Sequence, residues 1–200
     1  MNSGHQQSSL RVIAGKWRSR KISFPTIDEL RPTSNRVRET LFNWLQGSVK
    51  GEDCLDLFAG SGACGIEALS RGARSVVFVE KNRDAAGIIK ENLRALGADS
   101  VNVQCTDVIS WLESASTPLQ QEFGLVFIDP PYDANLEKSC CWKLEQSGRL
   151  KSAALIYLES DKRQLSAERP PNWDVIKSKK AGRVNFYLFR RTGSINKGTT

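Results

Sequence analysis

Two short motifs carry side chains that could do chemistry, and each follows an apolar run typical of a buried strand. The first runs from Asp56 to Gly62 (DLFAGSG) and combines a carboxylate with a glycine turn. The second runs from Asp129 to Tyr132 (DPPY) and combines a carboxylate, a rigid step and an aromatic ring. Glycine lets the backbone approach a ligand where a side chain would clash, so the first motif is typical of a nucleoside-cofactor site. The two motifs together predict transfer of a methyl group from S-adenosylmethionine to an exocyclic nitrogen of a nucleobase.

The glycine turn also fits a second class of cofactor. Gly60 to Gly65 matches the G-x-G-x-x-G fingerprint of dinucleotide-binding folds, and Glu80 follows about twenty residues later, so a nicotinamide-dependent enzyme is an alternative. S-adenosylmethionine is favoured because Asp56 would repel a pyrophosphate but attract an aminoacyl ammonium, and because no separate substrate domain is available. Glu80 would bind the ribose and Asp107 the adenine amine, unless both acids only cap helices. The residues expected to hold the donor are Asp56, Phe58, Ala59, Gly60, Gly62, Glu80, Lys81, Asp107 and Val108.

The Asp-Pro-Pro-Tyr motif provides what an exocyclic amine needs in order to react. Consecutive prolines fix two φ angles and donate no hydrogen bonds, so they hold the residues on either side in place. Asp129 and the carbonyl of Pro130 can accept both hydrogens of the amine and stabilise the positive charge that develops during attack on the sulfonium methyl. Tyr132 can stack on a flipped-out base, which contributes about 1–3 kcal/mol. The expected catalytic residues are Asp129, Pro130, Pro131 and Tyr132, and the alternative is an ordinary proline-rich turn.

Such a site needs neither histidine nor metal, because the sulfonium is an activated donor and positioning alone can contribute about 7–11 kcal/mol. The only histidine of the 200 residues is His5, in a polar stretch, which excludes histidine-based triads and argues against a histidine-ligated metal. The five cysteines include no Cys-x-x-Cys pair, so free thiols in a reducing cytoplasm are expected. We expect no signal peptide and no membrane-spanning segment.

The distribution of charge indicates an acidic partner. The formal net charge is +7 and the pI is about 9.3, which favours nucleic acid. Basic residues crowd both flanks of the chain, while the middle that carries the two motifs is closer to neutral. The N-terminal flank contributes Arg11, Lys16, Arg18, Arg20, Lys21, Arg31, Arg36 and Arg38. The C-terminal flank contributes Lys177, Lys179, Lys180, Arg183, Arg190 and Arg191.

The alternation of apolar runs and helical patterns predicts an α/β fold with a mostly parallel, doubly wound, Rossmann-like sheet that ends in an antiparallel hairpin. Strands are expected over 10–14, 19–24, 54–58, 75–80, 101–105, 124–128, 153–158, 175–179 and 184–189. Helices are expected over 62–70, from Asn82 to Gly97, from Asp107, and over 135–146. We expect one methyltransferase domain at 10–192, with an N-terminal extension at 10–47 and a catalytic core at 53–192, between disordered tails at 1–9 and 193–200.

One more helix, in the N-terminal extension, carries two arginines whose placement can be predicted from periodicity. Ser34 can cap this helix and Gly47 can end it. Its expected apolar face consists of Val37, Leu41, Trp44 and Leu45. Arg36 and Arg38 fall off that face, so we expect them to be solvated or in contact with a ligand.

Several blocks of the sequence are similar to one family. They are Arg11 to Arg18 (RVIAGKWR), Leu30 to Thr33 (LRPT), Arg36 to Leu45 (RVRETLFNWL), Asp56 to Gly62 with Glu67 to Ala73 (EALSRGA), and Asp129 to Tyr132. Together they resemble the bacterial 16S ribosomal RNA guanine-N2 methyltransferase family, small-subunit type D, from about Leu10 to Arg191. Cys64 stands where this family more often has an aliphatic residue, Tyr132 stands where phenylalanine is common, and 137–149 is less typical of it.

The resemblance implies a Rossmann-like methyltransferase fold with S-adenosylmethionine as the donor. It implies as target one guanine in a 16S rRNA hairpin loop near the decoding region, within assembled or partly assembled 30S particles. It also implies that the N-terminal hairpin touches RNA and that Arg31 to Thr33 lie near the donor and the target. The residues expected to bind RNA are Arg11, Lys16, Trp17, Arg18, Arg20, Lys21, Arg31, Arg36 and Arg38. We expect a cytoplasmic monomer with no metal and no membrane partner.

Three other functions stay open at this point. An N6-adenine methyltransferase could use the same Asp-Pro-Pro-Tyr motif, although the stretches between the motifs are too short for the target-recognition insert of most such DNA enzymes. A ribosome-assembly factor could bind RNA with little turnover, although the transfer site is complete. Methylation of a protein glutamine amide could use a similar Pro-Pro motif, but the basic flanks argue against it.

Overall fold

Strands and helices alternate along the chain between an N-terminal and a C-terminal hairpin. The computed structural model describes residues 7–25, 35–99, 101–114, 121–131, 136–161 and 169–193. The strands are β1 (Gln7–Arg11), β2 (Lys21–Pro25), β3 (Asp53–Leu57), β4 (Ser75–Glu80), β5 (Val101–Cys105), β6 (Phe123–Ile128), β7 (Leu150–Ser160), β8 (Trp173–Ala181) and β9 (Val184–Arg191). The helices are α1 (Asn35–Trp44), α2 (Ala63–Ser70), α3 (Arg83–Leu96), α4 (Val108–Ser114) and α5 (Glu137–Gln146).

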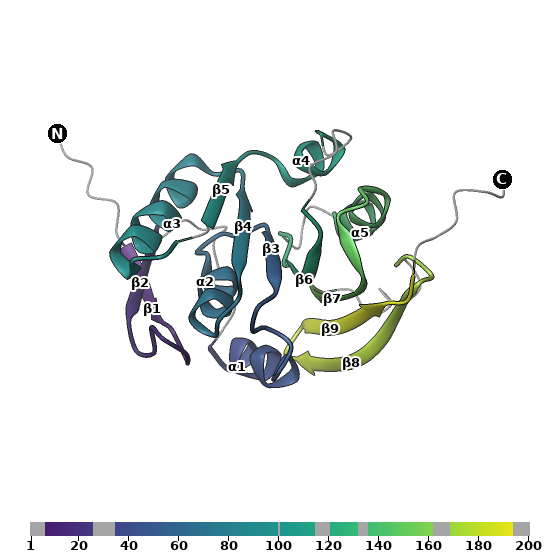
Figure 1. Cartoon of the computed structure of the whole chain (residues 1–200), viewed down its shortest axis with the longest axis horizontal. Helices are drawn as coiled ribbons and strands as arrows, with labels where there is room; N and C mark the ends of the chain where they lie inside the picture. Colours follow the sequence, from purple (N-terminus) through teal and green to yellow (C-terminus); the bar gives the residue numbers. More distant parts are fainter. Residues whose placement is uncertain are drawn as a thin grey trace.

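The main sheet has seven strands in the order β5-β4-β3-β6-β7-β9-β8 (Figure 1). The first five of these run parallel, whereas β9 pairs antiparallel with β7 and β8 pairs antiparallel with β9. In chain order, β4 is added beside β3 and β5 beside β4, and β6 is then added on the other side of β3. The strand order therefore reverses between β3 and β6, which is where open α/β sheets bind ligands. This topology confirms the predicted Rossmann-like sheet with antiparallel end strands.

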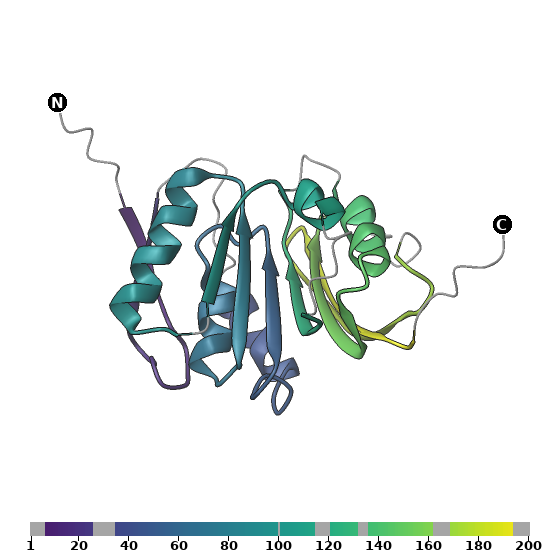
Figure 2. The same cartoon turned by 45° about the horizontal axis from the view of Figure 1, so that its top comes forward.

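Helices cover both faces of the main sheet (Figures 1 and 2). One face packs against α1, α2 and α3 through an apolar cluster that includes Leu41, Ile66 and Ile89. The other face packs against α4 and α5 through a cluster that includes Trp111 and Leu144. Because β3 has strands on both sides and helices on both faces, it is buried along its whole length.

Element boundaries mostly follow the local signals in the sequence. The side chain of Asn82 accepts hydrogen bonds from the N–H groups of Asp84 and Ala85, and Gly97 ends α3 in the left-handed conformation. β7, β8 and β9 are longer than the expected 153–158, 175–179 and 184–189, because each is extended by pairing with its neighbours.

The N-terminal strand starts before the position expected from the sequence. Gln7–Ser9, which we assigned to a disordered tail, pair with Ser23–Pro25 as the first part of β1. The polar side chains of this segment favour a disordered tail, but strand pairing uses only backbone groups and does not require apolar side chains. Residues 1–6 and 194–200 lie outside the described residues.

The N-terminal hairpin is fastened to α2. β1 and β2 form a separate two-stranded sheet, and the Glu67 carboxylate accepts hydrogen bonds from the N–H groups of Ile13 (2.8 Å) and Ala14 (3.0 Å) in the connecting loop. The Ser70 hydroxyl accepts from the N–H of Trp17 (3.0 Å) and donates to the carbonyl of Ala14 (2.5 Å). The hairpin is thus fixed to the helix that follows the glycine turn.

A buried ion pair fastens the C-terminal hairpin to α5. The Glu145 carboxylate accepts hydrogen bonds from Nε (2.8 Å) and Nη2 (2.7 Å) of Arg191, from Nε1 of Trp173 (2.9 Å) and from Nδ2 of Asn172 (3.0 Å). Burial acts to raise the pKa of Glu145, but the bonds from Arg191, Trp173 and Asn172 lower it below its ordinary value. Glu145 therefore stays ionised between the helix and the two strands.

Four of the five thiols are packing residues. Cys54, Cys64, Cys140 and Cys141 are buried, Cys105 is exposed and all are free; burial raises the pKa of the four buried thiols, that of Cys141 to about 12. Within the described ranges no group of three or more His, Cys, Asp or Glu side chains is arranged to hold a metal ion. No helix in the same ranges combines the length and apolar character needed to cross a membrane.

Candidate active site

The glycine turn after β3 and the Asp-Pro-Pro step after β6 lie side by side at the carboxyl edge of the sheet. Asp56 pairs with Phe127, and Leu57 with Ile128, so β3 and β6 end in register. The chain therefore leaves both strands at the point where the strand order reverses. The two motifs, far apart in the sequence, form one site.

The turn between β3 and α2 has a backbone conformation suited to close approach by a ligand. Phe58, Gly60 and Gly62 have φ angles of 62°, 53° and 73°. Glycine adopts this region freely, whereas a non-glycine residue such as Phe58 does so at a cost of about 1–3 kcal/mol, a form of strain that clusters at functional sites. A Cβ atom on Gly62 would lie 3.2 Å from Cγ1 of Ile89 in α3. The turn therefore has room for glycine but little for a larger residue.

Glu80, at the end of β4, holds this turn in place. One of its carboxylate oxygens accepts a hydrogen bond from the N–H of Gly60 and the other from the N–H of Asn82, both at 2.7 Å. The side chain is buried. A carboxylate oxygen can accept more than one hydrogen bond, so this structural role is compatible with binding ribose hydroxyls. The structure places the predicted ribose-binding acid next to the glycine turn.

Asp56 is a buried carboxyl group beneath the turn. Its Oδ2 accepts a hydrogen bond of 2.8 Å from the N–H of Gly65, and a Cβ atom on Gly65 would lie 3.0 Å from this oxygen and 2.2 Å from Cε1 of Phe78. Burial raises the pKa of Asp56 to about 8; the bond from Gly65 opposes this shift, and the charges of Asp129 and Glu80 add to it. A ligand ammonium beside Asp56 would favour its ionised form.

Asp56→Asn is expected to remove a pH-dependent loss of stability. The folded protein keeps this carboxyl protonated up to about pH 8, whereas the unfolded chain ionises it near pH 3.8. Protonation therefore stabilises the folded protein fully below pH 3.8, and this stabilisation is lost as the pH rises through 8. Asparagine can still accept the bond from Gly65 but does not ionise. We therefore expect the variant to exceed the wild type in Tm more at pH 8 than at pH 5, by about 2–4 °C for each kcal/mol recovered. Calorimetric melts at both pH values check this, and an equal difference at the two would contradict the raised pKa.

The remaining predicted donor residues lie at the same edge of the sheet. Asp107 follows the outermost strand, β5, where it is exposed and its Oδ1 accepts a hydrogen bond of 3.0 Å from the N–H of Ser110. It therefore caps α4, as the helix-capping alternative predicted. Lys81 is exposed, whereas Val108 and Ala59 are buried.

The Asp-Pro-Pro step leaves β6 beside the glycine turn. Asp129 is half-buried, Pro130 is buried and Pro131 is exposed. The negative charge of Asp129 contributes to the raised pKa of Asp56, so the two carboxyl groups lie near each other. Tyr132 lies outside the described residues, and stacking by its ring stays a prediction.

A further buried acid, which sequence reasoning missed, lies next to this step. β7 pairs with β6 up to Ile128–Leu158 and then continues, so Glu159 comes directly beyond the last pair. Glu159 is buried, and its Oε1 accepts a hydrogen bond of 2.7 Å from the hydroxyl of Tyr157. Burial, then the charge of Glu159, raises the pKa of Tyr157, and Asp129 contributes to the same shift. An acid at the carboxyl end of a parallel strand is the available signal, but the apolar run that predicts this strand stops at Leu158.

The N-terminal hairpin presents a basic surface. Its exposed cationic residues are Arg11, Lys16, Arg18, Arg20 and Lys21. Trp17 differs from the prediction, because its ring is only 6% exposed and packs in the core instead of offering a face to RNA. The loop approaches α2 so closely that a Cβ atom on Gly15 would lie 1.8 Å from the carbonyl oxygen of Ser70, which explains the burial of the neighbouring ring.

Arg38 is also buried, contrary to the prediction that it is solvated or touches a ligand. Its Nη2 donates hydrogen bonds to the carbonyl of Arg11 (2.6 Å) and to Oδ1 of Asn35 (3.0 Å), which ties α1 to the hairpin. The reason is helical spacing: Arg38 precedes the buried Leu41 and Leu45 by three and seven positions and shares their face. Burial lowers the pKa of Arg38.

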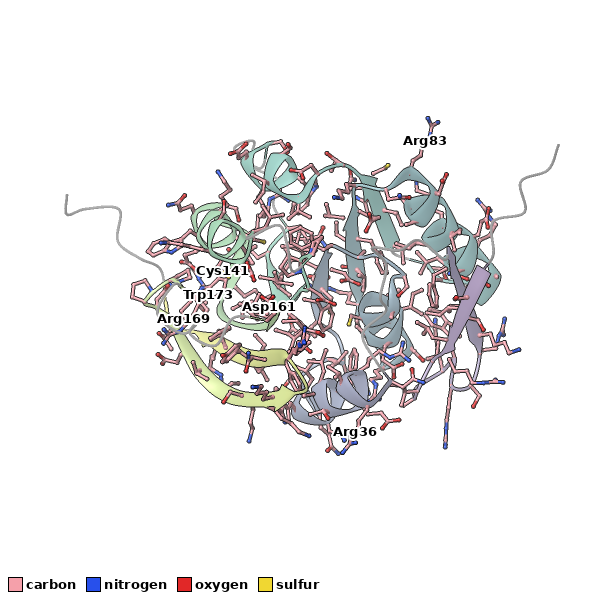
Figure 3. The ribbon with its side chains drawn as sticks, turned by 180° about the vertical axis from the view of Figure 1, so that it is seen from behind. Arg36, Arg83, Cys141, Asp161, Arg169 and Trp173 are labelled. Atoms are coloured by element: carbon pink, nitrogen blue, oxygen red, sulfur yellow. The ribbon has the colours of Figure 1, made fainter. Side chains whose placement is uncertain are left out.

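The other arginines predicted to bind RNA are less informative about the site. Arg36 is exposed and projects from α1 at the margin of the molecule opposite to Arg83 (Figure 3). Arg31, with the rest of the Leu30 to Thr33 block and the predicted cap Ser34, lies outside the described residues. Among the described residues predicted to bind RNA, the exposed cations therefore lie mainly on the N-terminal hairpin. The C-terminal hairpin carries a second exposed basic group, made of Lys177, Lys179, Lys180, Arg183 and Arg190, whereas Arg191 is buried.

Comparison with known proteins gives the same fold and one family. The family model described as conserved hypothetical protein 95 matches residues 10–190. The ribosomal RNA small subunit methyltransferase D of Escherichia coli (strain K12) is 41% identical over 182 residues, which cover 91% of this chain and 90% of that protein. A solved structure described as putative methyltransferase yhhF from Escherichia coli superposes with a TM-score of 0.81 at 38% identity, covering 94% of this chain and 100% of that one.

A more distant solved structure supports the fold alone. It is described as a putative SAM-dependent methyltransferase from Streptococcus mutans, with a TM-score of 0.71 at 15% identity, and the match covers 94% of this chain and 56% of that one. The arrangement of the sheet is thus that of the Rossmann-like methyltransferases. The family model and the identity to the Escherichia coli protein extend over nearly all of the sequence. The chain therefore belongs to the ribosomal RNA small subunit methyltransferase D family.

Proposed function

We propose that this protein is an S-adenosylmethionine-dependent methyltransferase that modifies the exocyclic N2 of one guanine in 16S rRNA. The observation that carries the proposal is the meeting of the glycine turn and the Asp129 step where the strand order reverses. The name of the Escherichia coli relative supports ribosomal RNA of the small subunit as the substrate. The exposed basic hairpin supports a nucleic-acid partner. A ribosomal substrate also implies a cytoplasmic enzyme.

S-adenosylmethionine fits the site better than a dinucleotide does. Asp56 is a buried carboxyl whose pKa is already raised, and a pyrophosphate beside it would raise that pKa further. The aminoacyl ammonium of S-adenosylmethionine would instead compensate the carboxylate. We propose that Glu80 binds the ribose hydroxyls and that Asp107, besides capping α4, accepts from the adenine amine. The bound donor supplies an activated methyl group on its sulfonium.

Asp129 is the residue proposed to act on the target amine. Its carboxylate and the carbonyl of Pro130 would accept the two amine hydrogens and orient the nitrogen lone pair. Because Asp129 is half-buried, its interaction with the positive charge developing on that nitrogen is stronger than the same interaction in water. Tyr132 would hold the flipped-out base by stacking. The chain's part in the reaction is therefore orientation and charge stabilisation.

Labelled methyl transfer tests this proposal. S-adenosylmethionine with a labelled methyl group would be incubated with 30S subunits purified from a strain that lacks the protein. We expect label in 16S rRNA of these subunits, and none in subunits from the parent strain, whose target is already modified. Binding of both S-adenosylmethionine and 30S subunits without transfer would contradict the proposal and favour the assembly-factor alternative.

The double variant Lys16→Ala with Arg18→Ala is expected to weaken RNA binding and to reduce its dependence on salt. Both side chains are exposed on the hairpin loop. Each lost phosphate contact lowers the slope of log affinity against log salt by about 0.7–0.9, so two contacts should lower it by about 1.4–1.8. Affinities for 30S subunits measured between about 50 and 200 mM salt check this.

The matched control for this surface is Lys138→Ala with Lys143→Ala. These residues lie on α5, which covers the other face of the sheet from α2 and its hairpin. We expect the salt slope of the control to equal that of the wild type. If the hairpin variant also keeps the wild-type slope, the RNA-binding surface lies elsewhere on the molecule.

A further inference from the structure

A cavity of about 610 Å³ lies at the end of the sheet opposite to the proposed transfer site. Asp53, Phe123 and Lys151, at or next to the starts of β3, β6 and β7, contribute to its lining. Asp56 and the glycine turn lie at the other end of β3, and a five-residue strand spans roughly 13 Å at about 3.3 Å per residue. The cavity is therefore separate from the site of methyl transfer.

Arg149 is the feature of this cavity that requires an explanation. The residue is only 4% exposed, and its guanidinium carbon lies 4.4 Å from the centroid of the Trp111 ring. Within the described part of the chain, its guanidinium has no hydrogen-bond or ion-pair partner, and its Nε is fully buried. Burial lowers the pKa of Arg149, and no acidic group opposes this effect. Unlike Nε, the two Nη atoms are not sealed from the cavity, so they are free to donate to an anion that comes from outside the chain.

The other basic groups of the cavity already have partners. Arg74 forms an ion pair with Asp53, and Nζ of Lys151 lies 2.8 Å from Oε2 of Glu52. Among the described lining residues, Arg149 is thus the cation left to meet a ligand. These two ion pairs fix the rim, and they neutralise Arg74 and Lys151.

Amide side chains from the outermost parallel strand complete the lining. Nε2 of Gln104 donates a hydrogen bond of 2.7 Å to Oδ1 of Asn102. This leaves the amide nitrogen of Asn102 as a donor and the amide oxygen of Gln104 as an acceptor. A neighbouring donor and acceptor suit the edge of a base or the hydroxyls of a sugar. The volume lies within the range of about 300–1,000 Å³ typical of small-molecule sites and exceeds what a single ion needs.

We propose that this cavity binds a phosphate-bearing nucleotide unit, either a free nucleotide or one unit of an RNA strand, with the phosphate on Arg149. The planar guanidinium offers paired donors that match phosphate oxygens. The Asn102 and Gln104 amides would contact the sugar or the base. The site does not depend on the proposed methyl transfer, because Arg149 precedes β7 and lies at the end of the sheet opposite to the glycine turn and the Asp129 step.

Binding titrations with three probes test the proposal. Inorganic phosphate, guanosine 5′-monophosphate and a short unmodified RNA oligonucleotide would each be titrated calorimetrically in phosphate-free buffer of low salt. Saturating S-adenosylhomocysteine keeps nucleotides out of the proposed donor site. We expect Arg149→Met to weaken binding at least tenfold, because methionine keeps the apolar contact with Trp111 but has no charge. Arg94→Met, at an exposed arginine of α3, should stay within twofold of the wild type.

The outcomes separate the two sources of the phosphate. Binding of guanosine 5′-monophosphate that depends on Arg149 identifies a free nucleotide, and Arg149-dependent binding of the oligonucleotide alone identifies RNA. A wild-type protein that binds none of the probes, or an Arg149→Met protein with unchanged affinity, overturns the proposal. If Arg149→Met does not fold, Arg149→Lys tests the proposal instead, and we expect it to lower the affinity for the probe at least threefold. The rate of methyl transfer to saturating 30S subunits should be unchanged in Arg149→Met, so failure of this site is distinguishable from failure of the enzyme.

Discussion

Asp129→Ala is expected to abolish methyl transfer and to leave binding of the donor nearly intact. In our account Asp129 accepts a hydrogen of the target amine and stabilises the charge that develops on it, and it does not contact the donor. Loss of such a group lowers kcat by about 10²–10⁴-fold. Single-turnover methyl transfer measures the loss, and calorimetric titration with S-adenosylhomocysteine measures the donor site separately.

The donor titration also has an expected direction. The charge of Asp129 contributes to the raised pKa of Asp56, so its removal should make Asp56 easier to ionise and should not weaken the binding of an ammonium. Asp174→Ala, at an exposed acid of β8, serves as the control and should leave both measurements unchanged. A large loss of donor affinity in Asp129→Ala would place this residue in the donor site and contradict the role assigned to it.

Glu145→Ala is expected to destabilise the protein by about 3–5 kcal/mol, which is the usual cost of leaving one partner of a buried ion pair without the other. Arg191 would lose the carboxylate that accepts from its Nε and Nη2, and Trp173 and Asn172 would each lose an acceptor. A domain of this size loses about 2–4 °C in Tm per kcal/mol. Thermal and urea denaturation monitored by circular dichroism measure the change.

A more exposed ion pair, between α5 and α4, provides the comparison. Nζ of Lys143 lies 2.5 Å from Oε1 of Glu113, whose side chain is 58% exposed. Pairs of this kind contribute about 0–1 kcal/mol, so Lys143→Ala should change stability little. If Glu145→Ala were as mild as Lys143→Ala, the C-terminal hairpin would be held by apolar packing alone and our account of the Glu145 ion pair would be wrong.

The succession of strands and helices, and the mostly parallel sheet that they form, could be predicted from the sequence because their signals are local. Asn82 and Gly97 bound α3 through hydrogen bonds to their own neighbours in the chain. The glycine turn and the Asp129 step each follow a buried strand, and parallel strands bring their carboxyl ends to one edge without further information. The pairing of Glu80 with Gly60 follows from the same geometry.

What the sequence could not predict depends on contacts between distant segments. The family resemblance predicts that Trp17 touches RNA, but the attachment of the hairpin to Glu67 and Ser70 of α2 draws its ring into the core. Arg38 is buried because the inner face of α1 contains Arg38, Leu41 and Phe42. This face is rotated by about one residue from the predicted face, which begins at Val37. Glu159 was missed because pairing with two neighbours extends β7 beyond its apolar run.

We propose that this site methylates a guanine amine of 16S rRNA. The most direct test is to digest the rRNA of 30S subunits after reaction with the protein and to identify the modified nucleoside and its position by mass spectrometry. Our account predicts N2-methylguanosine at a single position. N6-methyladenosine would contradict the assignment of the target while leaving the donor and the chemistry of Asp129 intact. If no methylated nucleoside were found, the proposal that this site catalyses methyl transfer would be wrong.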